Sequence, residues 1–140
     1  MIQVSIVTRT LREGKTYNDF RRAWYHSVGF GTTNKMLSML NVANPREVIV
    51  VGLTDVSEES ANDLIALDAK ERREHSLDDV TEPEIQRTFA ILVSEDDFSA
   101  SGEIDFKPPT VGNEVTDMVE VNEALRIGAE LLASFIRDDE

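Results

Sequence analysis

The chain of 140 residues contains no cysteine, which excludes disulfide bonds, thiolate catalysis, iron–sulfur clusters and zinc sites with cysteine ligands. No apolar run approaches the ~20 residues that a membrane-spanning helix needs. No basic start is followed by an apolar stretch and a small-residue cleavage site, so we expect no secretory signal. These absences favour a cytoplasmic protein that does not contact a membrane.

Positive charge is scarce as well, with 14 Lys and Arg against 27 Asp and Glu, a formal net charge of -13. An acidic surface repels phosphate backbones, so we expect no nucleic-acid partner. The charge is uneven: residues 1–50 hold seven bases and three acids (7 − 3 = +4), and residues 51–140 hold seven bases and 24 acids (7 − 24 = -17). We interpret the acids as solvated surface. Alternatively, the basic part attracts an anionic ligand or the acidic tail, the latter between chains of a dimer.

Aromatic side chains make up 6% of the sequence, and the only Trp lies within residues 16–31, TYNDFRRAWYHSVGFG. Thr16 is a favourable helix N-cap, and Asp19 lies at the capping-box position. We therefore predict a helix that Gly29 and Gly31 terminate. At about 100° per residue, one face of this helix is aromatic and apolar, and it comprises Tyr17, Phe20, Ala23, Trp24 and Val28.

This stretch also supplies most of the candidate site residues. We interpret Trp24 as part of the core; alternatively, Trp24 or the flanking Tyr25 lines a ligand cavity between helix and sheet. Arg22 and His26 are four residues apart, and helical phase predicts that both point away from the Trp24 face. We interpret His26 as a helix-end residue; alternatively, it transfers a proton.

The flanking segments read as strands and a second helix. Residues 2–9 alternate, and Ile2, Val4 and Ile6 form one strongly apolar face. In a sheet with helices on one side, we expect the other face, which is semi-polar and ends in Arg9, to meet a cavity or a partner sheet. Gly52 predicts a bulge or a close approach. The remaining predicted elements are strands 34–42 and 46–53 joined as a hairpin, a helix from Ser57 to about residue 75, a helical turn at 82–84 and a strand at 88–94.

This order predicts an α+β fold of ferredoxin-like βαββαβ type, a four-stranded antiparallel sheet with two helices on one face. The other sheet face would be bare and apolar, and pairing of two sheets in a homodimer would cover it. We place this domain at residues 1–98.

Residues 99–140 then form an extension. Residues 95–113 are polar, contain Pro108 and Pro109, and read as a linker or arm. Residues 116–137 form an amphipathic helix with a stripe that includes Val121 and Leu125. Such a stripe packs on its own domain or reaches across to a partner, and we favour the partner.

The element order of residues 1–98, with the aromatic first helix FRRAWYHSVGFG, resembles the dimeric α+β-barrel superfamily. Within this superfamily the chain resembles EthD-like and antibiotic-biosynthesis-monooxygenase-like members, and the stretch is similar to the F-R-x-x-W segments of EthD-like members. In EthD-like members the histidine lies further after the tryptophan and precedes Gly-Pro, whereas His26 lies two residues after Trp24. The resemblance therefore implies a dimeric barrel and assigns no catalytic residue. Its members include cofactor-independent monooxygenases, haem-degrading enzymes and lactone isomerases.

No phosphate-binding glycine loop, nucleophile elbow or zinc-protease helix motif occurs in the sequence. Glu71 and His75 are four residues apart and precede several acids, a pattern that can hold a hard cation but is typical of a solvated charge run. We accordingly expect no metal and no cofactor.

Two hypotheses of function follow. In the first, the protein is a homodimeric module that binds a small organic molecule between helices and sheet. In the second, it is a cofactor-independent monooxygenase or isomerase that acts on an aromatic or lactone-like substrate. There Trp24 and Tyr25 shape the pocket, Arg9 or Arg22 holds an anionic group and His26 moves a proton. The second hypothesis requires Arg9 or His26 to converge with Trp24, which helical phase opposes for His26.

Overall fold

The computed structural model describes residues 1–26, 29, 33–55, 70 and 73–138. The chain divides into two compact units, Met1–Thr88 and Phe89–Glu140, and we describe each by itself. The second predicted helix, from Ser57 to about residue 75, lies almost entirely outside the described residues. No helix among the residues described is long and apolar enough to cross a membrane.

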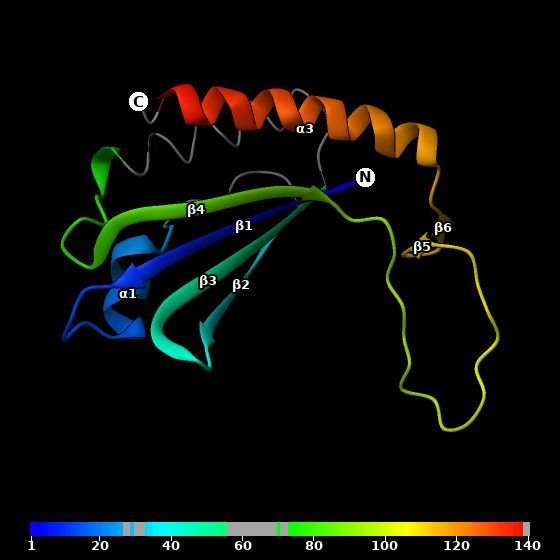
Figure 1. The fold of residues 1–140 in the computed structure, drawn as a ribbon, viewed down its shortest axis with the longest axis horizontal. Helices are drawn as coiled ribbons and strands as arrows, with labels where there is room; N and C mark the ends of the chain where they lie inside the picture. Colours follow the sequence, from blue (N-terminus) through cyan, green and yellow to red (C-terminus); the bar gives the residue numbers. More distant parts are fainter. Residues whose placement is uncertain (27–28, 30–32, 56–69, 71–72, 139–140) are drawn as a thin grey trace. The chain divides into compact units, whose positions relative to one another are not determined.

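A four-stranded sheet in the order β2-β3-β1-β4 organises the first unit (Figure 1). Its strands are β1 (Ile2–Leu11), β2 (Asn34–Asn41), β3 (Asn44–Asp55) and β4 (Thr81–Ile91). The strand β3 pairs antiparallel with both β1 and β2. The start of β4 lies beside the end of β1, where the Arg12 amide donates to the Val80 carbonyl at 2.8 Å, so this pair is antiparallel too. The predicted α+β class with a four-stranded antiparallel sheet is confirmed.

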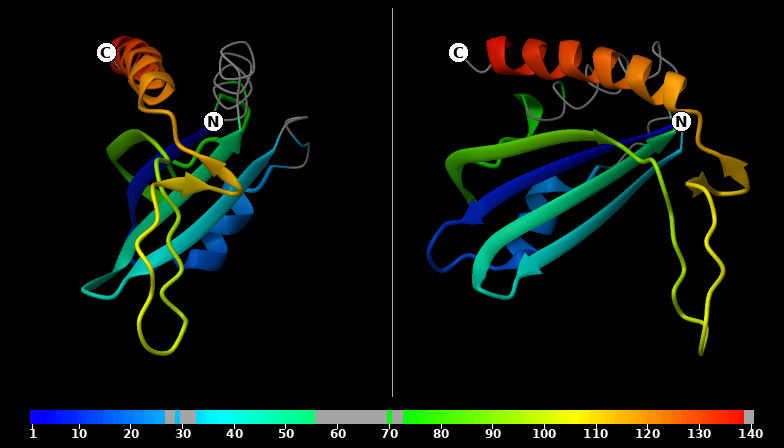
Figure 2. Two further views of the ribbon diagram at one scale, coloured as in Figure 1. Left: turned by 90° about the vertical axis from the view of Figure 1, so that its right-hand side faces the viewer. Right: turned by 45° about the vertical axis from the view of Figure 1, so that its right-hand side comes forward.

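One helix in the described part of this unit, α1 (Tyr17–Trp24), packs on one sheet face (Figure 2). The predicted capping box is present: the Asp19 amide donates to Thr16 Oγ1 at 3.3 Å, and the Thr16 amide donates to Asp19 Oδ2 at 2.8 Å. The core beneath α1 consists of Leu11, Phe20, Val48, Val50, Leu77 and Val80, with Tyr17, Ala23 and Trp24 packed against it.

The face of β1 that meets this core differs from the prediction. Val48 and Val50 are buried under Phe20, and the register places Arg9 opposite Val48 and Val7 opposite Val50. Directly opposed residues share a face. The face beneath α1 therefore carries Val7, Arg9 and Leu11, and we call it the helix-side face. The more apolar residues Ile2, Val4 and Ile6 lie on the opposite face.

The same register defines the rest of that opposite face. Ile49, Val51 and Leu53 alternate with the buried valines of β3, and Leu37 and Met39 of β2 pair with Val51 and Ile49. Leu37 and Met39 are 48% and 42% exposed. The sheet thus has apolar side chains on both faces, although β1 alternates in the sense opposite to the one expected.

The predicted helical turn at Glu82-Pro83-Glu84 is wrong, because these residues belong to β4, which begins at Thr81 rather than Thr88. Proline lacks an N–H for a strand ladder, but an edge strand needs only one hydrogen-bonded side. Since β4 is an edge strand, it accommodates Pro83.

The second unit contains the predicted C-terminal helix, α3 (Met118–Asp138), which is confirmed within two residues at its start. It also contains a small hairpin of β5 (Thr110–Val111) and β6 (Glu114–Val115) in the segment expected to be a linker. Residues 95–109, which we call the arm, form a long loop that begins and ends beside this hairpin. At its start the Glu95 amide donates to the Thr110 carbonyl at 2.9 Å.

Hydrogen bonds from Thr16 hold the pKa of the Asp19 carboxyl below its ordinary value. Because this pKa is lower in the folded chain than in the unfolded chain, ionised Asp19 stabilises the fold at pH values above the unfolded-state pKa. This contribution is lost as the pH falls through the folded-state pKa. We expect Asp19→Asn to be less stable than wild type near neutral pH, with the difference shrinking below about pH 4. Urea unfolding as a function of pH measures this difference in the free energy of unfolding, and Asp105→Asn, at an exposed position, is the control. A pH-independent difference would contradict this role.

Candidate functional site

The candidate site begins with a row of rings on the buried side of α1, those of Tyr17, Phe20 and Trp24, which we call the aromatic row. Tyr17 and Phe20 have ring centroids 6.1 Å apart, and Phe20 stacks on Trp24 at 6.0 Å with an interplanar angle of 10°. The spacing of three and four residues puts these rings on one helix face. Phe20 is 1% exposed, whereas Trp24 is half-buried at the edge of the core. Trp24 therefore has one face in the core and part of its indole outside it.

His26 lies against this tryptophan, contrary to the expectation from helical phase. The helix ends at Trp24, five residues before Gly29, because Tyr25 has extended backbone angles (φ -60°, ψ 131°). Helical periodicity therefore stops before His26. Its ring meets the Trp24 ring edge-on, with centroids 5.7 Å apart at 72°, and it is half-buried. The helix end therefore brings together the two groups that the sequence pattern separated.

Tyr25 and Arg22 lie at the surface. Tyr25 is 58% exposed, and the guanidinium of Arg21 sits 4.7 Å above its ring centroid, a cation–π contact. Arg22 is exposed on the solvent side of α1. The structure therefore groups Trp24 with His26 and leaves these two candidate residues outside the group.

Arg9 comes from β1 and lies on the helix-side face between Val7 and Leu11. Its Nη2 donates to Thr81 Oγ1 at 2.6 Å and lies 3.5 Å from the Glu82 carbonyl. Thr81 is fully buried, and its hydroxyl donates to the Leu77 carbonyl at 3.1 Å. Two hydrogen bonds in series thus hold the arginine at the start of β4, on the face that also meets the aromatic row.

The helix-side face contains further small and polar residues that the sequence reasoning did not assign to the site. Ser5, Gly52 and Met36 are aligned across three strands. A Cβ on Gly52 would lie 2.8 Å from Ser5 Oγ and 2.9 Å from Met36 Sδ, so the predicted close approach is confirmed, and the register runs through Gly52 without a bulge. Two features of the sequence indicated this group, namely the semi-polar face of the first strand and the glycine within the third.

The described residues show no group of three metal-ligating side chains close enough to hold an ion. Of the pair considered for a cation, His75 is exposed and Glu71 lies outside the described residues.

A comparison with models of protein families, with curated proteins and with solved structures finds no match to this chain. The geometry of its own residues is therefore the basis for any functional proposal.

The link from Arg9 to Thr81 predicts a stability effect. Thr81→Val keeps the side-chain shape but removes the buried hydroxyl that bonds Arg9 and the Leu77 carbonyl. We expect the free energy of unfolding to fall by about 1–3 kcal/mol, the cost of leaving buried polar groups without a partner. Urea denaturation measures it, with Thr88→Val on the same strand as an exposed control. Equal effects of both substitutions would contradict the role of this hydroxyl.

Proposed function

We propose that the protein is a homodimeric α+β protein that binds a small organic anion on the helix-side face, beside α1. The observation that carries the proposal is a half-buried guanidinium, that of Arg9, on the sheet face that also carries Val7, Leu11, Val48 and Val50. Small-molecule sites are mainly apolar with a few placed polar groups, and a charged group fixes the ligand's orientation.

The role of Arg9 follows from its geometry. A guanidinium has five N–H donors in a planar fork. The contacts of Nη2 with Thr81 Oγ1 and the Glu82 carbonyl fix the Arg9 side chain on the sheet face at the start of β4. A guanidinium binds a carboxylate by a bidentate pair of charge-assisted hydrogen bonds.

The aromatic row supplies the apolar part of the proposed site. Trp24 is stacked on one side by Phe20 and bordered at its edge by His26, so its orientation is fixed before any ligand arrives. A preorganised ring loses little conformational entropy on binding. An organic anion with an apolar, preferably aromatic, body would suit a sheet face that carries Arg9 and packs against the helix of this ring.

The proposed fold is ferredoxin-like, and two features support it. The strand β3 lies between β1 and β2, as a split β-α-β unit requires, and β1 occupies the sheet interior. The proposed homodimer is supported by the apolar face opposite α1, where Val4, Ile6 and Val51 lie with Leu37 and Met39. Apolar patches of this kind mark interaction sites.

The chain's only tryptophan makes the ligand proposal directly measurable, because all indole fluorescence reports on Trp24. We expect titration with benzoate to change this fluorescence in a saturable way, and Arg9→Gln to weaken binding by about 10- to 100-fold, the range for losing a charge-assisted hydrogen bond. The matched control is Arg22→Gln, an exposed arginine on the helix that carries Trp24. Equal binding by wild type and Arg9→Gln would overturn the proposed role of Arg9.

The contact between His26 and Trp24 favours a second candidate function, a cofactor-independent monooxygenase or isomerase acting on an aromatic or lactone-like substrate. An imidazole beside a bound ligand can move a proton at neutral pH. Under this alternative, His26→Gln abolishes conversion of the bound compound while Trp24 fluorescence still reports binding. Mass spectrometry of the compound after aerobic incubation measures conversion. If the compound is recovered unaltered from wild type, the enzymatic function is contradicted and only the binding function remains.

A further inference from the structure

The two edges of the sheet are protected unequally. Edge strands expose backbone N–H and C=O groups, and proteins guard them with charged residues and proline. On β4 these guards are present as Glu82, Pro83 and Glu84. On β2, Lys35 is the only charged residue and there is no proline, whereas Met36, Leu37, Met39 and Leu40 are 39–48% exposed. Within the described part of the chain no strand pairs with the outer side of β2, so this edge is open to pairing with another strand.

The register shows which backbone groups of β2 face this edge. The Asp55 amide donates to the Thr33 carbonyl at 3.3 Å, and the pairing continues from Asn34 opposite Thr54. In an antiparallel ladder, hydrogen-bonded and non-hydrogen-bonded pairs alternate. Odd-numbered residues of β2 therefore bond to β3, and the amides and carbonyls of Met36, Ser38 and Leu40 point to the free edge.

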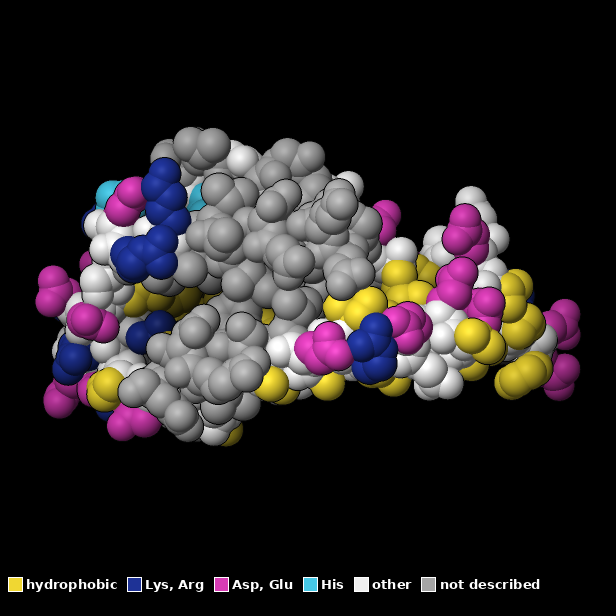
Figure 3. Space-filling view, turned by 90° about the horizontal axis from the view of Figure 1, so that it is seen from above, with side chains coloured by type: hydrophobic (Ala, Val, Ile, Leu, Met, Phe, Trp, Pro, Cys, Tyr) yellow, Lys and Arg dark blue, Asp and Glu magenta, His cyan; other side chains and the backbone are white. Residues whose placement is uncertain are grey.

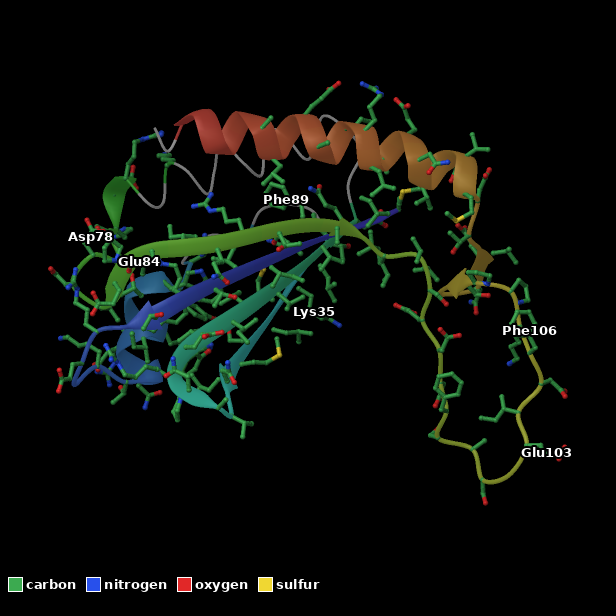
Figure 4. All side chains as sticks on the ribbon, in the orientation of Figure 1. Lys35, Asp78, Glu84, Phe89, Glu103 and Phe106 are labelled. Atoms are coloured by element: carbon green, nitrogen blue, oxygen red, sulfur yellow. The ribbon has the colours of Figure 1, made fainter. Side chains whose placement is uncertain are left out.

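The arm of the second unit contains a segment suited to this edge. Residues 103–107 (Glu-Ile-Asp-Phe-Lys) alternate between charged and apolar side chains, the pattern of a strand with one apolar face. Within the described chain they form no backbone hydrogen bond with another segment. Ile104 and Phe106 are 43% and 96% exposed, and Figure 4 shows Glu103 and Phe106 on one limb of the extended arm.

Charge complementarity favours a second copy of this chain as the occupant. Residues 95–107 hold five acids and one base (1 − 5 = -4), and Figure 3 shows acidic and hydrophobic side chains together at the right-hand end of the view. Residues 33–45, which contain β2 and the turn after it, have Lys35 as their single charge, and Figure 4 shows Lys35 extending from β2. Each copy carries both surfaces, so two copies can exchange arms in a closed dimer.

We propose that residues 103–107 of one copy add as a strand to the β2 edge of a second copy. Backbone hydrogen bonds to the edge groups of Met36, Ser38 and Leu40 would provide affinity, and Ile104 and Phe106, which share one face of the added strand, would cover the exposed apolar side chains on one face of β2. This arm exchange goes beyond the proposed function and does not require a ligand.

The test combines two measurements on the full chain: sedimentation velocity over a range of concentrations, and hydrogen exchange of the β2 amides by mass spectrometry. We expect Ile104→Ser/Phe106→Ser to raise the dimer dissociation constant about tenfold or more, as for loss of central apolar anchors, and to speed exchange in residues 34–41. The matched control is Phe98→Ser, which removes a 76% exposed Phe from the same arm outside the alternating segment and should change neither readout.

A second variant acts on the edge itself. Ser38→Pro removes one outward N–H and retains the β2–β3 ladder, because Ser38 does not bond to β3 through its amide. We expect it to raise the dissociation constant as the arm variant does. The arm variant should leave the benzoate titration of Trp24 fluorescence unchanged, so the ligand proposal and the arm exchange fail separately.

Several outcomes would overturn the proposal. These are a wild type that stays monomeric, an arm variant that leaves dimerisation unchanged, or a Phe98→Ser effect equal to that of the arm variant. Faster β2 exchange without weaker dimerisation would mean that the arm pairs with its own chain, and it would overturn arm exchange between copies. If Val51→Lys loses the dimer and the arm variant keeps it, the interface lies on the sheet face opposite α1. That result would also overturn arm exchange between copies.

Discussion

The packing of Phe20 against Val48 and Val50 is the contact on which the rest of the first unit depends. It determines which face of β3 meets α1, and the β1–β3 register carries that choice to β1. A strand has only two faces, so this single contact puts Arg9 beneath the helix and Val4 and Ile6 on the far side. One face thereby gains a cation among valines, and the other becomes an apolar surface.

The two proposed interactions come from different parts of the chain for a physical reason. The first unit holds the fixed aromatic row and the bonded arginine, which are rigid enough to orient a small molecule. The second unit holds an extended, acidic arm whose backbone groups lack a ladder, which suits it to pairing with an edge strand. The two surfaces do not compete, because they use different residues.

The sequence predicted the α+β class, the Thr16 cap, the β2–β3 hairpin and α3, because caps, turns and long periodic stretches are local signals. It mispredicted the packing face of β1, because alternation shows that two faces differ without showing which one meets a helix. Pro83 was read as a helix start although an edge strand accepts it. For the candidate site, Arg9 and Trp24 were predicted from residue type, and their role in binding stays a prediction. The contact between His26 and Trp24 was missed because the helix ends at Trp24, without a glycine to mark the end.

Native mass spectrometry of the purified wild-type chain under gentle desolvation tests the central claim most directly, namely that a homodimer holds an organic anion beside Arg9 and Trp24. We expect a dimer that retains a small organic molecule, which on release carries a carboxylate or a comparable anionic group. A monomer without a bound molecule, at concentrations where sedimentation also finds no association, would contradict it.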